Sequence, residues 1–275
     1  MIPLKGAFPF RVGTTSYIRP ADILENAEFL KDTVDDIELV LFESDEISNL
    51  PDADTVRRLA AIAREQALTY TVHLPLDIDP ASQDPGIRSQ SIAKCLRIIE
   101  LVLPLNPFAY ILHLYAPGAS LFSESDRRSW RAHAGDSVSA LVRESAVSPH
   151  LFAVETLDFE FTLAEPVVND HGLSICLDVG HLWRCGFPVD DHLQRYLGRT
   201  RVMHLHGVRD GKDHLDLSVL DPTALAAVTT ALAADCTTPR VLTIEVFSEP
   251  DLDLSLRALA AVRDGALAAR PGEAS

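Results

Sequence analysis

The sequence predicts a single (β/α)8 barrel. Apolar runs of strand length alternate with amphipathic helical stretches, and eight such units fit within the 275 residues. No GxGxxG or GxxxxGK[ST] motif follows any of these runs, which disfavours a doubly wound nucleotide-binding sheet. Since no linker divides the chain, we expect one domain over residues 1–268 and a disordered tail over residues 269–275.

The eight predicted strands are rich in Val, Ile, Leu and aromatic residues, and polar, Gly- or Pro-containing segments follow them. In chain order they are FRVGTTSY (10–17), DDIELVLFES (35–44), LTYTVHLP (68–75), FAYILHLY (108–115), LFAVETLD (151–158), LSICLDVGH (173–181), TRVMHLHGV (200–208) and RVLTIEVF (240–247). Helical periodicity is clear in residues 21–34, 53–66 and 87–102. An Ala-rich stretch between residues 217 and 239 is also expected to be helical.

Composition narrows the class of partner. A net charge of −16 disfavours extensive binding to a nucleic-acid backbone, which needs clustered Lys and Arg. The start MIPLKGAFPF has no charged segment followed by a long apolar one, so we expect a soluble cytoplasmic protein without membrane contact. Cys95, Cys176, Cys185 and Cys236 are widely spaced, which is typical of small buried side chains rather than of disulfides or a zinc ribbon.

Acids and histidines gather at one end of the predicted strands. In a (β/α)8 barrel this carboxyl end carries the active site. The candidate metal ligands there are His73, His113, Glu155, Asp178, His181, His204, His206 and Glu245, with His214 in the loop after the seventh strand. Imidazoles and carboxylates at this density suit zinc, manganese or iron.

Each candidate alone has a simpler explanation. A His at a strand end can be a hydrogen-bonded polar cap, and Asp178 can cap the next helix. Their joint placement favours a metal centre, because buried carboxylates grouped without a cation repel one another. The other histidines, His133, His150, His171 and His192, fall in predicted helices or turns and are expected at the surface.

Spacing adds detail to the metal hypothesis. His204 and His206 are two residues apart on a strand and therefore share a face, so either could be the ligand. Gly180 permits a turn that would bring Asp178 and His181 to one centre. Glu155 and Glu245 lie on different strands and could bridge two ions.

With these ligands in strand order, the chain resembles the xylose-isomerase-like barrels, which include sugar phosphate isomerases, epimerases and endonuclease IV. The resemblance to the isomerases and epimerases implies one divalent ion held by Glu155, Asp178, His204 or His206, and Glu245. The resemblance to endonuclease IV implies up to three zinc ions, with added ligands at His73, His113, His181 and His214. The number of ions therefore lies between one and three.

One position departs from the endonuclease pattern, which reads Asp-x-His in the loop after the seventh strand. Lys212 stands where that pattern has Asp, and Asp213 is adjacent to His214. The third ion therefore lacks a ligand unless Asp213 shifts into its place.

Three short motifs resemble a narrower group, the cobamide-remodelling phosphodiesterases. They are GTTSYI at residues 13–18, ELVLFES at 38–44 and the HLHG…DH pattern from His204 to His214. This resemblance implies hydrolysis of the nucleotide loop of a cobamide such as coenzyme B12, giving cobinamide phosphate and α-ribazole.

The leading functional hypothesis is metal-dependent hydrolysis of a phosphodiester in a small-molecule substrate. Divalent ions supply hydroxide near neutral pH and stabilise the leaving oxygen. Glu155, Glu245 and Asp178 would be the catalytic carboxylates, either holding the attacking water or bridging ions.

Other polar residues near the same strand ends are candidates for substrate binding. The loop cations Arg184, Arg209 and Lys212 would offset phosphate charge or remain solvated. Glu43 would bind substrate or support a ligating His, or would be a simple acid at a strand end.

Three alternatives remain open. In a ketose isomerase or epimerase, Glu155 and Glu245 would move a proton, which leaves His73 and His113 without a role. Repair of abasic DNA would use the same ligands, although the acidic chain speaks against it. A non-catalytic barrel would bind a ligand through its metal. One ion per chain favours the isomerase, whereas two or three favour phosphoester chemistry. The sequence indicates no particular oligomeric state.

Overall fold

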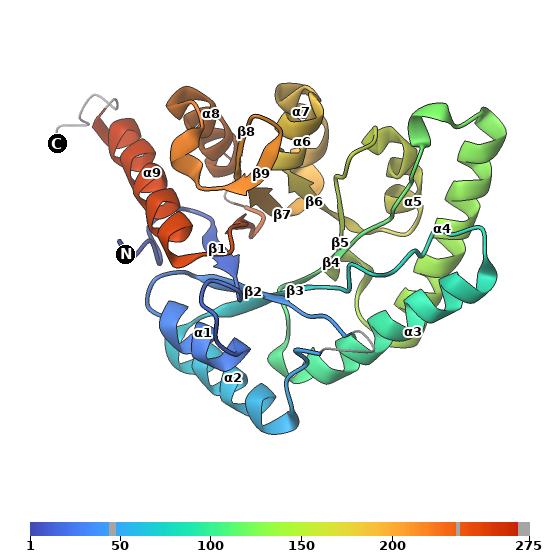
Figure 1. The fold of residues 1–275 in the computed structure, drawn as a ribbon, viewed down its shortest axis with the longest axis horizontal. Coiled ribbons are helices and arrows are strands. Elements are labelled where there is room, and N and C mark those ends of the chain that lie inside the picture. Colours follow the sequence, from blue (N-terminus) through green and yellow to red (C-terminus); the bar gives the residue numbers. More distant parts are fainter. Residues whose placement is uncertain (44–47, 235–236, 269–275) are drawn as a thin grey trace.

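The computed structural model describes residues 1–43, 48–234 and 237–268 and confirms the (β/α)8 barrel (Figure 1). Eight parallel strands close in the order β1-β10-β7-β6-β5-β4-β3-β2, and each lies within a predicted run. Their bounds are β1 (Arg11–Thr15), β2 (Asp36–Val40), β3 (Thr69–His73), β4 (Ala109–Leu112), β5 (Phe152–Glu155), β6 (Ser174–Asp178), β7 (Thr200–Leu205) and β10 (Val241–Ile244).

Helices surround the barrel (Figure 1). They are α1 (Ile23–Leu30), α2 (Ala53–Gln66), α3 (Pro85–Val102), α4 (Glu124–Ser145), α5 (Glu165–Asp170), α6 (Val179–Cys185), α7 (Val189–Tyr196), α8 (Pro222–Ala233) and α9 (Glu249–Ala268). The Ala-rich prediction corresponds to α8. An antiparallel hairpin of β8 (Gly207–Arg209) and β9 (Lys212–Leu215), absent from the sequence-based prediction, stands between β7 and α8.

Local sequence explains where several helices begin. Asp22, Asp52 and Asp84 each precede a helix and accept a hydrogen bond from a backbone N–H of its first turn. Such side chains satisfy N–H groups that have no partner within the helix. These caps fix the points at which the loops after β1, β2 and β3 enter their helices, and so shape the mouth of the barrel.

Small apolar side chains fill the middle of the barrel. They form one cluster, which contains Ala109, Ile111, Ala153, Cys176, Val202 and Val241. A larger cluster of Leu, Ile, Val and aromatic residues packs between the strands and the helices. These side chains fill the barrel interior below the mouth, as is usual for this fold.

Some expectations about individual residues need correction. His192, expected at the surface, is buried: its Nδ1 lies 2.8 Å from the carbonyl oxygen of Pro188, and its ring packs against Phe187 and Tyr196. His150 is exposed, whereas His133 and His171 are half-buried.

The cysteines follow the sequence expectation in part. Cys95 and Cys176 are buried and free, as expected, but Cys185 is only half-buried. Cys236 and the tail over residues 269–275 lie outside the described residues. Within the described ranges, no helix has the length and apolar character needed to cross a bilayer.

Candidate metal centre

The ends of the barrel strands, together with α6 and the β8–β9 hairpin, bring all nine predicted ligands to the mouth of the barrel. Seven of them are at most 8% exposed, and they are His73, His113, Glu155, Asp178, His204, His206 and Glu245. His181 in α6 and His214 in β9 are half-buried at the rim. Buried charges of this density need partners, and their contacts define three neighbouring groups of side chains.

The first group joins β3, β4 and β5. Glu155 Oε2 lies 2.8 Å from His113 Nε2 and 3.6 Å from His73 Nε2. The Nδ1 atom of His73 lies 2.8 Å from the carbonyl oxygen of Leu74, which only accepts hydrogen bonds. His73 therefore carries its proton on Nδ1 when neutral, which leaves Nε2 free to bind a metal.

The second group surrounds one nitrogen of His204. Its Nδ1 lies 3.4 Å from Glu245 Oε2, 3.7 Å from Glu155 Oε2 and 4.0 Å from Asp178 Oδ2. Three carboxylates from β5, β6 and the end of β10 thus face one imidazole nitrogen. Glu155 belongs to the first group as well, a position from which it could bridge two ions.

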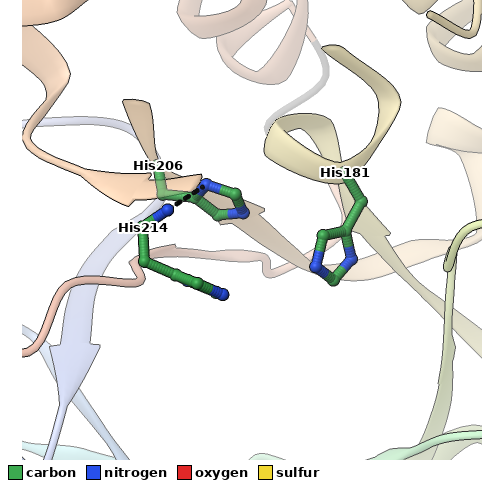
Figure 2. A group of neighbouring side chains, drawn as sticks. All are labelled: His181, His206 and His214. Carbon is green, nitrogen blue, oxygen red and sulfur yellow. Dashed lines mark hydrogen bonds between the residues drawn. The ribbon is translucent and has the colours of Figure 1, made fainter. Parts of the chain in front are cut away.

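The third group, shown in Figure 2, consists of His181, His206 and His214. One nitrogen of each ring lies within 4.8 Å of the others. However, the backbone N–H of His214 donates to His206 Nδ1 at 3.0 Å, so a neutral His206 carries its proton on Nε2. That Nε2 lies 3.3 Å from Asp178 Oδ1. In this conformation His206 Nε2 lies beside Asp178 but forms no hydrogen bond with any described residue, and His204 is the imidazole that faces three carboxylates.

Asp178 caps a helix, which is one of the two roles that the sequence left open, and its other oxygen faces an imidazole. Its Oδ1 accepts the backbone N–H of His181 at 2.8 Å and so caps α6, while Oδ2 lies 2.9 Å from His181 Nδ1. Gly180 has a different role from the predicted turn, since it lies within α6. A Cβ at Gly180 would clash with the ring of His206, so only glycine lets this ring approach the helix.

The imidazoles and carboxylates of the site shift one another's pKa values. Burial lowers the pKa of His73 and His181, but contacts with carboxylates outweigh it and raise these pKa values to about 9 and about 11. Burial alone would raise the pKa of Glu155, yet His113 and His204 hold it well below its usual range. Protons on the imidazoles thus supply the positive charge that the carboxylates require.

Divalent ions fit this arrangement better than protons do. His204 Nδ1 and Glu245 Oε2 are buried and form no hydrogen bond with any described residue, and buried Asp178 Oδ2 has a contact with His181 Nδ1 at 2.9 Å. Buried polar atoms are rarely left without a partner. Because these three converge on one point with Glu155, a cation coordinated there would satisfy all of them. Carboxylate and imidazole together match zinc, manganese or iron, as expected from the sequence.

The predicted substrate-binding residues lie outside these groups. Arg184 forms an ion pair with Asp213, and Arg209 and Lys212 are exposed on the β8–β9 hairpin. Asp213 therefore does not take the ligand position that Lys212 leaves empty in the sequence pattern. Glu43 forms an ion pair with Arg97 of α3.

Sequence reasoning missed two residues that contact the ligands. Glu38 of β2 is fully buried, and its Oε2 lies 2.9 Å from His204 Nε2. The hydroxyl of Tyr115 lies 2.8 Å from His113 Nδ1. The sequence did offer a signal for Glu38: it lies in the middle of the predicted strand DIELV, and a buried Glu needs a partner.

Fold and site together define a (β/α)8 barrel with a candidate metal centre at its carboxyl end. The family described as the xylose isomerase-like TIM barrel matches residues 28–259, and the chain belongs to this family. No curated protein matches the chain significantly in sequence.

Solved structures share the fold at low sequence identity. A D-tagatose 3-epimerase-like protein is 18% identical with a TM-score of 0.72, over 94% of this chain and 99% of that one. Endonuclease IV from Thermus thermophilus is 17% identical with a TM-score of 0.66, over 93% and 99%. The IOLI protein with a bound zinc atom is 13% identical with a TM-score of 0.66, over 94% and 97%. At these identities the likeness shows the fold alone.

Proposed function

We propose that this protein is a metal-dependent phosphodiesterase that binds at least two divalent ions and acts on a small molecule. One observation carries the proposal: two ligand groups, His73–His113–Glu155 and the three carboxylates around His204 Nδ1, share Glu155. Two ions bridged by a carboxylate are the usual arrangement for displacement at phosphorus.

Charge also supports a phosphodiester as substrate. The acidic ligands are Glu155, Asp178 and Glu245, and the imidazoles add no charge when neutral. Two divalent ions would carry one positive charge more than these three carboxylates, and the buried Glu38 beside His204 offsets that charge. The loaded centre would therefore be close to neutral, so it repels the single negative charge of a phosphodiester less than the metal-free carboxylates do, even within a chain of net charge −16.

The chain's own residues supply the acid–base chemistry. Hydrolysis forms a bond between the oxygen of water and phosphorus and breaks one ester bond, whose oxygen leaves as an alcohol. Water loses one proton to a base and the leaving oxygen gains one. Glu245, at 8% exposed, is more accessible than Glu155 or Asp178, and we assign it the proton from water. Bound ions lower the pKa of water and stabilise the leaving oxygen.

The particular substrate proposed is the nucleotide loop of a cobamide, with cobinamide phosphate and α-ribazole as products. Support comes from the resemblance of GTTSYI, ELVLFES and HLHG…DH to the cobamide-remodelling phosphodiesterases. The described parts of these motifs run along β1, β2 and β7 and through the β8–β9 hairpin, toward the end of the barrel that holds the candidate ligands. Tyr17 of the first motif is 43% exposed there, and it lines a cavity of about 440 Å³ between the loops after β1 and β2.

A sugar isomerase or epimerase is the second candidate. Glu155 and Glu245 approach the same His204 nitrogen, at 3.7 Å and 3.4 Å, as expected of two acids on either side of one ion. Several similar structures are named as epimerases, including a 3-keto-D-glucoside 4-epimerase from E. coli. This candidate needs only one ion and gives the contact between His113 and Glu155 no catalytic role.

One panel of reactions separates the candidates. Zinc-loaded protein is incubated with adenosylcobalamin, with bis(p-nitrophenyl) phosphate, with abasic-site duplex DNA and, in D2O, with ketohexoses, and the products are analysed by mass. We expect cobinamide phosphate and α-ribazole from the first. Cleavage of other phosphodiesters with intact cobamide would overturn the substrate only. Deuterated sugar without any phosphodiester cleavage would overturn the hydrolase.

A substitution tests the carboxylate chemistry. Glu245→Gln keeps the shape of the side chain but removes one charge, so turnover should be lost while the far-ultraviolet circular dichroism spectrum stays unchanged. Full activity in this variant would remove Glu245 from the site.

A further inference from the structure

The two ring nitrogens of His204 face different surroundings. Nδ1 points to Glu245 and Glu155, whereas Nε2 lies 2.9 Å from Glu38 Oε2. His204 and Glu38 are both fully buried, so water does not compete for this contact. Glu38 reaches His204 from β2, across the interior from β7.

We infer that Glu38 is a positioning residue, which holds His204 so that Nδ1, and not Nε2, faces the metal ion. A carboxylate only accepts hydrogen bonds, so the Nε2 beside it carries the proton and Nδ1 keeps a free electron pair. A histidine that binds a metal commonly donates its other N–H to a carboxylate, which fixes the ring and makes it a stronger ligand. The inference rests on the proposed metal centre but not on the substrate.

Depth in the barrel distinguishes Glu38 from the ligands. Glu38 pairs in register with Thr71 of β3, two residues before His73. It therefore lies one layer below the mouth, on the same inward face of β2 as Asp36.

The ring itself separates Glu38 from the ion. The electron pairs of the two imidazole nitrogens point away from each other, so an ion at Nδ1 lies on the opposite side of the ring from Glu38. Although Glu38, His204 and Glu245 lie near one another, Glu38 does not share the ion that His204 Nδ1 binds.

The burial of Glu38 has no structural rationale without His204. Its other oxygen, Oε1, is buried and forms no hydrogen bond with any described residue. A buried carboxylate is costly to the fold unless it is paired, and His204 is the hydrogen-bond partner of Glu38. The contact gives His204 a fixed ring orientation at the point where the three carboxylates meet.

Two variants and one matched control test this role. Glu38→Gln keeps an accepting oxygen and removes the charge, whereas Glu38→Ala removes both. Asp36→Asn is the control, because Asp36 is a buried acid on the same strand and face but contacts Thr69 rather than a ligand. Zinc affinity is measured by competition with a chelator, and the histidine nitrogens are followed by ¹⁵N NMR in zinc-loaded protein.

We expect Glu38→Ala to weaken zinc binding by about 10- to 100-fold and Glu38→Gln by less, with Asp36→Asn unchanged. Wild-type protein and Glu38→Gln should show His204 coordinated through Nδ1 and protonated on Nε2.

Coordination through Nε2 in wild-type protein would overturn the inference. Loss of a whole zinc equivalent in Glu38→Gln would also overturn it, because Glu38 would then be a ligand. If Glu38→Ala does not fold, the zinc content of Glu38→Gln and the ¹⁵N NMR spectrum of the wild-type protein still test the role of Glu38. Absence of phosphodiesterase activity alone would overturn the proposed function and leave these measurements intact.

Discussion

The two ends of the barrel interior bury acids in different ways. At the amino end, Asp36 Oδ2 lies 2.5 Å from the hydroxyl of Thr69, and burial raises the pKa of Asp36 to about 7. At the carboxyl end, contacts with imidazoles hold the pKa values of Glu155 and Asp178 below their usual range despite burial. Asp36 thus tends to lose its charge at neutral pH, whereas the acids at the mouth keep theirs.

This difference in charge state distinguishes Asp36, a structural acid, from the candidate ligands Glu155 and Asp178. Each end contains buried polar atoms without a hydrogen bond to a described residue, Asp36 Oδ1 among them at the amino end. Among the described residues, carboxylate oxygens from several strands converge around one imidazole at the mouth. Burial of an acid is therefore weak support for a metal site, and convergence of several partnerless ligand atoms is strong support.

The largest effect is expected from Glu155→Gln, which removes the carboxylate shared by both ligand groups. Zinc affinity and turnover should each fall by more than about 100-fold, since losing even an outer partner of a ligand costs about 10- to 100-fold. Chelator competition and steady-state kinetics measure the two losses. Asp36→Asn should change neither zinc affinity nor turnover. Equal losses in Glu155→Gln and Asp36→Asn would contradict the claim that only the acids at the mouth bind metal.

Metal removal should destabilise the mouth. An ion at 100 times its dissociation constant stabilises the folded state by about 2.7 kcal/mol, so adding a chelator should lower the melting temperature by several degrees. Differential scanning calorimetry with and without zinc gives the shift. Glu155→Gln should lose most of this shift while Asp36→Asn keeps it, and a wild-type protein indifferent to zinc would contradict the metal centre.

The metal-free protein should lose stability as pH rises. The pKa values of His73 and His181 are raised in the folded state to about 9 and about 11, above the 6.5 of a free histidine. The folded state then holds more protons than the unfolded one, so the stabilisation is complete below about pH 6.5 and is lost as pH rises through these values. Denaturant titrations from pH 6 to 10 measure it. Saturating zinc displaces these protons and should flatten the dependence.

A smaller effect is expected from Tyr115→Phe. The hydroxyl of Tyr115 meets His113 Nδ1 at 2.8 Å, so its loss frees the ring to rotate without removing a ligand. We expect zinc affinity to fall by about 10-fold, at the lower end of the range for such partners. The same chelator competition measures it. A loss in Tyr115→Phe as large as that in Glu155→Gln would contradict the assignment of Tyr115 as a supporting residue rather than a ligand.

The smallest functional effect belongs to Asp36→Asn, which should act on stability alone. The pKa of Asp36 rises from 3.8 to about 7, so its ionisation destabilises the fold progressively as pH rises between these values. Removing the charge should therefore increase the free energy of unfolding at about pH 8 by up to about 4 kcal/mol, because each pKa unit corresponds to about 1.4 kcal/mol, with turnover unchanged. Denaturant titration checks this, and a destabilised variant would show that the charge itself is required.

Much of this molecule could be predicted from its sequence, because strand periodicity and the position of polar residues at strand ends are local signals. His73, Glu155 and Asp178 end their strands as expected. Contacts across the barrel are not local: the pairing of Glu38 with His204 joins residues 166 positions apart. The β8–β9 hairpin, which carries His214, was missed for the related reason that its strands are short and its ion pair with α6 depends on the fold.

Packing also decided details that residue types left open. Gly180 was predicted as a turn and is instead required by the close approach of His206. His204 directs Nδ1 to the carboxylates, whereas Nδ1 of His206 accepts the backbone N–H of His214, and Asp213 pairs with Arg184. Such outcomes follow from side-chain geometry rather than from spacing in the sequence.

The number of ions tests the central claim most directly. Protein stripped with chelator, reloaded with zinc and freed of excess metal is analysed for zinc and sulfur together, which gives ions per chain. Two or more zinc ions in the wild-type protein, falling in Glu155→Gln but not in Asp36→Asn, is the result we predict. A single ion per chain, held equally by all three proteins, would contradict the shared metal centre and favour the isomerase or epimerase.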